Sequence, residues 1–291
     1  IDLVPMPQFF EVFSNKIFTL RIAKLIGFYV VFYTCLSAIF FLFLSLYLGT
    51  LDYEIPRFYG KGTVIGNKPG IGYQPWLIDD PDSTLIKFIP NKRSSYAHYV
   101  SAIKEYLAKY ENTTNTRNCT GNESNLEIVR DWKLTEERKP ACRFDLKIFK
   151  DFGCNETNDF GFAENKPCVV LSLNRLIGWM PTELEGEIPK EISDRYQKGF
   201  ITFNCYGVHD WDKKNIGEIE YIPSAGIDIR FYPYAVMPNY HQPITMVKFN
   251  NLIKNVLIKV ECRAYAGNIV HDIINRLGLV RFEIFLHDSI E

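Results

Sequence analysis

Two aspartates separated by one residue are the most visible candidates for chemistry in this sequence. Asp210 and Asp212 flank Trp211 in the stretch "HDWDKKN". Carboxylate oxygens are the ligands that hard divalent cations prefer, and many membrane-anchored glycosyltransferases hold a metal and a sugar nucleotide with such a pair. Two acidic residues in a polar turn are, however, far more often a solvated hairpin tip. The pair is therefore a weak signal for glycosyl transfer.

Other patterns that carry chemistry are missing from the sequence. None of the five histidines belongs to an HExxH motif, and no two cysteines form a CxxC pair. There is no G-x-S-x-G elbow and no glycine-rich phosphate loop. The formal net charge is −1, and no basic patch with interleaved aromatic residues supports nucleic-acid binding. The sequence therefore indicates no metal site and gives no signal for nucleophilic catalysis or phosphate binding.

Cysteines and glycosylation sequons gather in the C-terminal part of the chain. An even number of cysteines beside N-x-S/T sequons is typical of an oxidising, extracellular compartment. The sequons are at Asn112, Asn118, Asn122 and Asn155. Six of the seven cysteines accompany them: Cys119, Cys142, Cys154, Cys168, Cys205 and Cys262.

A single apolar segment lies between these sites and the N-terminus. No charged residue occurs from Leu25 to Leu51. As a helix this segment would extend about 40 Å, which exceeds the hydrocarbon core of about 30 Å and allows some tilt. Because the sequons follow it, we predict a single-pass type II membrane protein. Residues 1–24 form the cytoplasmic tail, residues 25–51 the membrane helix, and the C-terminus is extracellular.

Two tyrosines lie well inside this apolar segment. A tyrosine hydroxyl in hydrocarbon costs free energy unless it is hydrogen-bonded. With each residue turned about 100° from the last, the tyrosines share one side of the helix with other large residues. We call this side the tyrosine face and expect it to contact a partner helix: Tyr29, Tyr33, Leu36 and Phe40. The alternative is that aromatic residues are simply common in membrane helices.

Beyond the membrane segment the pattern changes twice. Residues 52–93 are rich in proline and glycine and are predicted to form an extended stalk. Residues 94–291 are then predicted to form the folded ectodomain. It begins with a surface helix capped by Ser94 or Ser95. Its apolar stripe has helical spacing: Tyr96, Tyr99, Val100, Ile103, Leu107 and Tyr110.

The rest of the ectodomain alternates with the period of β-strands. "FITFNC", "VLIKVEC" and "VRFEIFL" each place apolar side chains on one face and polar ones on the other. In the first two segments Cys205 and Cys262 lie on the apolar face. Two inward-facing cysteines from separate strands fit an inter-sheet disulfide in a β-sandwich. The residues themselves leave the other cysteine pairs open.

Taken together, these features resemble the β-subunit family of the Na+/K+-ATPase and H+/K+-ATPase. The likeness runs over nearly the whole chain and includes the segments "FYVVFYTCLSAIF", "FGFAENKPCVVLSLNRLIGWMP", "RFYPYAVMPNYHQPITMVKFNNL" and "VECRAYAGNI". One departure is visible. The family motif tyrosine-tyrosine-proline-tyrosine-tyrosine-glycine reads here Phe231, Tyr232, Pro233, Tyr234, Ala235 and Val236. The last two positions differ.

The resemblance implies an Ig-like sandwich ectodomain that caps the outer loops of a catalytic α subunit. It also implies which ectodomain residues contact α: Phe231, Tyr232, Pro233 and Tyr234. The cysteine order of the family implies the disulfides Cys119–Cys142, Cys154–Cys168 and Cys205–Cys262.

In function, the resemblance implies a non-catalytic subunit at the plasma membrane. Such a subunit assembles with the α subunit, stabilises it, delivers it to the plasma membrane and modulates its K+ affinity. ATP, Mg²⁺, Na+ and K+ would bind the α subunit, which leaves no cofactor on this chain. A small single-span regulatory subunit and membrane lipid are further expected partners. Two alternatives remain: the β subunit of an H+/K+-ATPase, and a glycosyltransferase that uses Asp210 and Asp212.

Overall fold

The structure is a computed structural model that describes residues 6–52, 56–119 and 140–288. Side chains are described from residue 21 onward. The chain divides into two compact units, Ile1–Arg57 and Phe58–Glu291. The first contains one long helix and the second is the mostly β ectodomain, and each is described by itself below.

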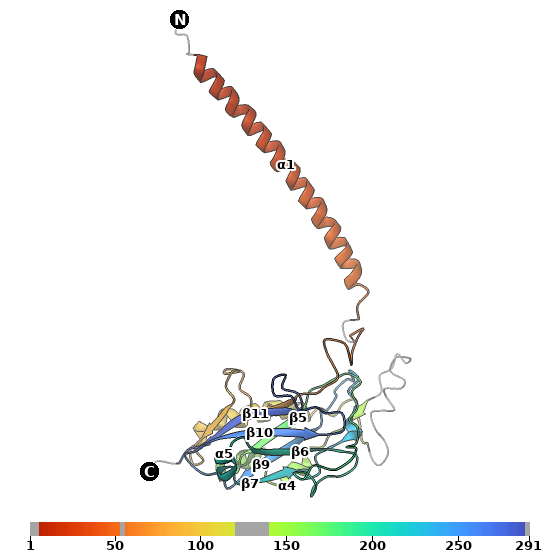
Figure 1. Ribbon diagram of the computed structural model, residues 1–291, viewed down its shortest axis with the longest axis vertical. Helices are drawn as coiled ribbons and strands as arrows, with labels where there is room; N and C mark the ends of the chain where they lie inside the picture. The colour runs from red at the N-terminus through yellow and green to blue at the C-terminus, as the bar shows by residue number, and fades with distance from the viewer. Residues whose placement is uncertain (1–5, 53–55, 120–139, 289–291) are drawn as a thin grey trace. The chain divides into compact units, whose positions relative to one another are not determined.

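Helix α1 (Met6–Leu48) forms the N-terminal unit (Figure 1). Its part from Arg21 to Leu48, 28 residues, is long and apolar enough to cross a membrane. The helix ends earlier than Leu51, the predicted end. The amides of Thr50 and Leu51 bond to carbonyls only three residues back, as in a turn. Gly49 stands directly after the last helical residue, where glycine commonly ends a helix.

Two β-sheets form the body of the ectodomain. The first is antiparallel with the strand order β1-β5-β9-β7, and its strands are β1 (Ile71–Gln74), β5 (Cys168–Leu173), β9 (Ile244–Asn250) and β7 (Glu218–Ile222). The second has the order β2-β11-β10-β6-β8, and only its β2–β11 pair is parallel. Its strands are β2 (Leu85–Phe88), β11 (Leu279–Leu286), β10 (Leu257–Tyr265), β6 (Phe200–Gly207) and β8 (Ile227–Asp228).

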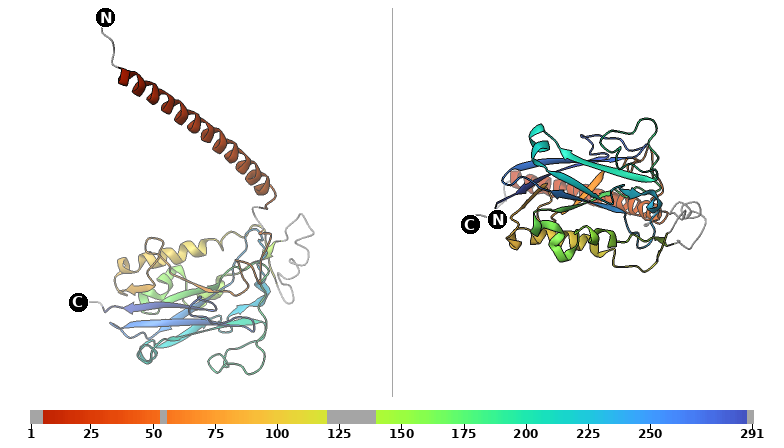
Figure 2. Two further views of the ribbon diagram at one scale, coloured as in Figure 1. Left: turned by 45° about the horizontal axis from the view of Figure 1, so that its top comes forward. Right: turned by 90° about the horizontal axis from the view of Figure 1, so that it is seen from below.

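Short helices and a small third sheet complete the described ectodomain. The α-helices are α2 (Ala97–Ala108), α4 (Lys147–Asp151) and α5 (Asp210–Asn215), and the small sheet pairs β3 (Thr116–Arg117) with β4 (Ala141–Cys142). The 3-10 helices are η1 (Arg93–Ser95), η2 (Glu156–Glu164) and η3 (Ile229–Phe231). Both views of Figure 2 show α2 on one side of the strands, where it packs against β1 and η2 while η2 packs against β5.

Strand β5 shows the consequence of this layering. All six of its residues are buried, because the second sheet covers one face of the first sheet and α2 with η2 covers the other. A strand buried on both faces has no need of polar alternation. This explains why its sequence, "CVVLSL", reads as a nearly continuous apolar run.

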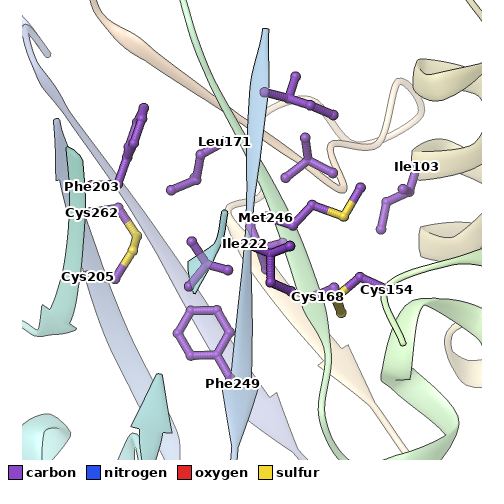
Figure 3. Packing of buried hydrophobic residues seen from close by; sticks show 14 of the residues in the cluster. Ile103, Cys154, Cys168, Leu171, Phe203, Cys205, Ile222, Met246, Phe249 and Cys262 are labelled. Atoms are coloured by element: carbon purple, nitrogen blue, oxygen red, sulfur yellow. A yellow bond between two sulfur atoms is a disulfide. The ribbon is translucent and has the colours of Figure 1, made fainter. Parts of the chain in front are cut away.

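Buried apolar side chains fill the core between the layers (Figure 3), and aromatic rings are among them. Phe282 on β11 stacks on Tyr73 of β1 with ring centroids 5.0 Å apart and meets Phe249 of β9 edge-on at 6.1 Å. On the helical side, Phe162 of η2 packs against Tyr99 of α2 at 5.9 Å. One continuous apolar core therefore spans both sheets and the helices.

The predicted helical stripe is confirmed, but its predicted cap is wrong. All six residues of the stripe are buried. The residue at the N-terminal cap is Tyr96, and its side chain makes no capping bond. Ser94 and Ser95 instead belong to η1, and the Ser95 hydroxyl bonds to the carbonyls of Ile89 and Lys92. A 3-10 turn in front of α2 thus takes the place of a serine cap.

Residues 71–88 are not part of a stalk, although the proline- and glycine-rich composition predicts one over residues 52–93. Strand β1 pairs with β5, and strand β2 pairs with β11. The compact ectodomain unit begins at Phe58. Apart from Gly72 in β1, the prolines and glycines lie outside these two short strands, which is why composition hid the strands.

The disulfide Cys205–Cys262 lies within one sheet, so the predicted inter-sheet placement is wrong. The two cysteines face each other directly in the β6–β10 register, and their Cα atoms are 4.0 Å apart. Both side chains are buried, as the alternation predicts. Residues opposite each other on neighbouring antiparallel strands share a face and lie close together. Facing alone therefore does not distinguish neighbouring strands from opposed sheets.

Candidate partner interfaces

The tyrosine face of α1 carries hydroxyl groups that no described residue of its own unit satisfies. The rings of Tyr29 and Tyr33 stack with centroids 6.0 Å apart, and their residues are 47% and 57% exposed. Neither hydroxyl bonds to another described residue, whereas the Thr34 hydroxyl donates to the Val30 carbonyl at 2.7 Å. Phe28 and Phe32 form a similar stacked pair at 6.1 Å. The hydroxyls, rather than exposure or ring packing, distinguish the tyrosine face.

The segment Phe231–Val236 belongs to a cluster of aromatic side chains in the ectodomain. We call this cluster the aromatic corner: Trp179, Tyr232, Tyr234 and Tyr240. The Asp228 side chain caps η3 by accepting the Arg230 amide at 2.8 Å, and it forms an ion pair with the Arg230 guanidinium at 2.5 Å. The chain then turns Tyr232 inward, where its ring meets Trp179 edge-on at 5.6 Å. Burial raises the pKa of Tyr232 well above its ordinary value, so this phenol stays neutral at physiological pH.

Tyr234 occupies the outer part of the same corner. Its ring lies 4.9 Å from that of Tyr240, and the Arg175 guanidinium lies 5.9 Å from the Tyr234 ring centroid. The Gly178 amide donates to the Tyr234 carbonyl at 2.8 Å, which ties the corner to the segment after β5. Sequence patterns did not single out Arg175 or Tyr240, since contacts between residues so distant in the chain leave no local signal.

The four motif residues expected to touch a partner differ in accessibility. Tyr232 and Pro233 are buried within this chain, while Phe231 and Tyr234 are partly exposed. Phe231 also packs edge-on against Phe144 at 5.2 Å. Of the four motif residues, only Phe231 and Tyr234 are therefore accessible to another molecule in this conformation.

Val236 stands in a backbone conformation that suits glycine. Its φ is +53°, and a β-branched residue in this left-handed region is strained. We expect Val236→Gly to raise the free energy of unfolding by about 1 kcal/mol, since relief of about 1–2 kcal/mol exceeds the entropic cost of glycine. Val236→Ala should bring no comparable gain, because alanine has the same clash in this region. Denaturant unfolding of both variants checks this, and a glycine variant less stable than wild type would contradict it.

The Asp210 and Asp212 carboxylates do not form a joint site. Asp212 is buried, and its two oxygens accept the backbone amides of His209 at 2.9 Å and Lys259 at 3.1 Å. Asp210 is exposed and pairs with Lys213 on the same helix at 2.9 Å. The residues lie in the first turn of α5, not at a hairpin tip. Among the described residues, no group of three or more metal-ligating side chains gathers anywhere.

Three of the four sequon asparagines lie within the described residues, and Asn122 lies outside them. Asn112 and Asn118 are exposed. Asn155 is only partly exposed and caps η2 by accepting the Thr157 amide at 3.0 Å, while its own amide nitrogen lies 3.3 Å from the Lys150 carbonyl. Since the glycan would attach to that nitrogen, Asn155 is the most hindered of the three described acceptors.

The disulfides fix the ectodomain at three places. They join Cys119 to Cys142, Cys154 to Cys168 and Cys205 to Cys262, the same pairs that the resemblance implies. Figure 3 shows two of them in the packed interior. The second ties β5 to the turn before η2 and so holds the helical layer on the first sheet. The free cysteine within the described residues is Cys35, on α1.

The sequence of this chain is similar to one protein family and to several known proteins. Residues 20–282 match the family described as "Sodium / potassium ATPase beta chain". The chain is 50% identical over 263 residues to the probable sodium/potassium-transporting ATPase subunit beta-3 of Caenorhabditis briggsae, covering 90% of this chain and 79% of the relative. It is 29% identical over 280 residues to the sodium/potassium-transporting ATPase subunit beta-2 of Drosophila melanogaster, covering 91% and 85%. The region matched by the family, residues 20–282, includes the membrane-length part of α1 and the strands of both sheets up to the middle of β11.

Proposed function

The chain belongs to the sodium/potassium ATPase beta chain family, and from this premise we propose that it delivers its pump to the plasma membrane and modulates the pump's affinity for K+. As a member of this family it is a non-catalytic subunit that assembles with the catalytic α subunit, and it carries no cofactor. The observation that carries the proposal is the match over residues 20–282, which takes in helix and ectodomain together.

The topology follows from the same proposal. The N-terminus is cytoplasmic and the ectodomain is extracellular, an arrangement supported by three disulfides and by sequons confined to the ectodomain. The two stacked sheets correspond to an Ig-like sandwich with a helical layer added to one face. A small single-span regulatory subunit and membrane lipid are the further partners of α1.

Two surfaces make the contacts with the α subunit in this proposal. The tyrosine face of α1 lies against a membrane helix of α, where at least one of the hydroxyls of Tyr29 and Tyr33 finds an acceptor. On the ectodomain, Phe231 and Tyr234 contact the outer loops of α from the aromatic corner. The unsatisfied hydroxyls on α1 support the first contact, and the partial exposure of the two motif rings supports the second.

The tyrosine face is tested by truncating it. Tyr29→Ala with Tyr33→Ala removes two large packing surfaces and two hydroxyls, so we expect clearly less α subunit to co-purify from detergent. Tyr→Phe at either position removes only a hydrogen bond, worth about 0.6 kcal/mol in a membrane, and should leave assembly intact. The measurement is the ratio of α to this chain after affinity purification.

The matched control replaces two aromatic residues outside the tyrosine face. Phe28→Ala with Phe41→Ala removes a similar apolar area and should reduce co-purification less. Equal recovery of α with both double mutants would show that the tyrosine face has no partner helix. Loss of α with the control alone would place the contact on another side of α1.

A further inference from the structure

Strand β1 has an open edge. It is the first strand in the order β1-β5-β9-β7, so only one of its edges is paired. The Asn174 amide donates to the Gly70 carbonyl at 3.0 Å. Since hydrogen-bonding direction alternates along an antiparallel strand, this bond turns the peptide groups of Ile71 and Tyr73 away from β5. Their backbone groups bond to no other described residue.

The β2 edge of the second sheet, unlike the β1 edge of the first, is covered by a side chain. At β2, the Tyr99 hydroxyl from α2 accepts the Lys87 amide at 3.1 Å and donates to the Leu85 carbonyl at 3.2 Å. A side chain of α2 thus occupies the edge of β2. An edge without such cover presents a row of free donors and acceptors that can pair with another chain.

A groove of about 800 Å³ runs beside the open edge of β1. Its walls include all four residues of β1, the first residues of β11, and the side chains of Trp76 and Ile273. Trp76 is 46% exposed and Ile273 is 52% exposed. The groove therefore offers apolar anchor points next to unpaired backbone groups. We call it the β1 groove.

The charged residues that line the β1 groove are all positive, while Glu283, outside the lining, accepts a hydrogen bond from Thr84 at 2.6 Å. Arg175, Arg276 and Arg281 line it, and none of the described residues that line it is acidic. Glu261 neutralises Arg281 from 2.5 Å, and Arg175 donates to the neutral Gln242 amide oxygen at 3.1 Å. The Arg276 side chain forms no ion pair or hydrogen bond with another described residue. Two of the three guanidinium groups are thus left without a carboxylate.

Another cation stands close to the same groove. Lys109 lines an adjoining hollow that shares Trp76 and Tyr106 with the β1 groove and also includes Asp79 and Glu105. Burial, together with the charge of Arg175, lowers the pKa of Lys109 to about 8. Positive charges are therefore crowded at the junction, while the adjoining hollow itself carries both signs. A negatively charged ligand is therefore attracted by the arginines of the β1 groove rather than by the adjoining hollow.

We propose that the β1 groove binds an acidic peptide segment of another protein, in an extended conformation, as an added strand on the open edge of β1. Main-chain hydrogen bonds to Ile71 and Tyr73 would supply affinity in this mode, and pockets for alternate side chains would supply specificity. The guanidinium groups of Arg175 and Arg276 select acidic side chains.

The test uses the full-length chain in detergent and a fluorescently labelled hexapeptide of alternating valine and glutamate. Anisotropy should report saturable binding of this peptide, and the version with lysine in place of glutamate should not bind. Arg276→Glu should weaken binding about tenfold, because it replaces an attraction by a repulsion, and Arg276→Gln should have an intermediate effect. Lys214→Glu makes the same charge change on α5, outside the β1 groove, and should leave binding unchanged.

The strand geometry has its own control. N-methylation of the three valine amides or of the three glutamate amides removes donors from one edge of the peptide only. One of the two methylated peptides should lose binding and the other should keep it. Equal binding of both, or no binding of the parent peptide, would overturn the proposal. An Arg276→Glu chain that binds as tightly as wild type would overturn it as well. Co-purification of the α subunit is a separate measurement, so failure here leaves the family function standing.

Discussion

Replacing Cys205 and Cys262 together with alanine should lower the free energy of unfolding by about 4 kcal/mol. The two residues are 57 positions apart in sequence, and a cross-link that closes a longer loop removes more entropy from the unfolded chain. Alanine avoids burying hydroxyl groups, which matters because both cysteines are buried in the core. Guanidinium unfolding of the full chain, followed by tryptophan fluorescence, measures the loss.

Two further variants test whether loop length sets the size of this loss. The pair Cys154 and Cys168 is only 14 positions apart, so its removal should cost less, about 3 kcal/mol. Cys35→Ala removes no disulfide and should leave ectodomain stability unchanged. A smaller loss for Cys205 and Cys262 than for Cys154 and Cys168 would contradict the argument from loop length.

Glu261→Ala should produce the second large loss, about 2–3 kcal/mol. Glu261 is 1% exposed and accepts hydrogen bonds from three side chains on three adjacent strands. The Arg263 guanidinium lies 2.6 Å and the Arg281 guanidinium 2.5 Å from its oxygens, and the Tyr206 hydroxyl also donates to it. Glu261→Ala removes the acceptor that the Arg263 and Arg281 guanidinium groups and the Tyr206 hydroxyl share. Glu218→Ala, at an exposed site on β7, should change stability by no more than about 0.5 kcal/mol.

The contribution of Glu261 should also depend on pH. Burial raises the pKa of this carboxyl, but hydrogen bonds from Tyr206, Arg281 and Arg263 outweigh burial and hold the pKa below its ordinary 4.5. A carboxyl whose pKa is lowered by folding stabilises the protein above its unfolded pKa, and this contribution is lost as pH falls through the folded pKa. The stability difference between wild type and Glu261→Gln should be constant down to about pH 5 and shrink below it. A difference that grows on acidification would contradict this.

The alternation in the sequence predicted correctly on which face of its strand a residue lies. It did not predict which residues lie next to it on the neighbouring strands. The alternation in "VLIKVEC" puts Cys262 on the apolar face and Glu261 on the polar one, and both placements are right. Glu261 is nevertheless buried, because its register partners Tyr206 and Arg281 lie directly beside it and cover it. Cys262 likewise pairs with Cys205 on the adjacent strand. A period of two gives the face of a residue, while register, set by long-range pairing, gives its neighbours.

Composition was misleading where short strands lie between turns. The prolines and glycines of residues 52–93 predict a stalk, yet β1 and β2 each contribute an edge strand to a sheet. Four-residue strands leave too little pattern to recognise in such surroundings. The aromatic corner was equally hidden, since Trp179 meets Tyr232, and Tyr240 meets Tyr234, only in the folded chain. By contrast, the stripe of α2 has enough residues for its period to be read directly.

Assembly with a catalytic α subunit is tested by purifying the affinity-tagged full-length chain from detergent-solubilised membranes. We expect a catalytic α subunit of a Na+/K+-transporting ATPase to co-purify in near one-to-one ratio. The complex should hydrolyse ATP in a K+-dependent manner, and the isolated chain should not. Recovery of the folded, disulfide-bonded chain without any such ATPase would show that the chain is not the partner of a Na+/K+-transporting α subunit.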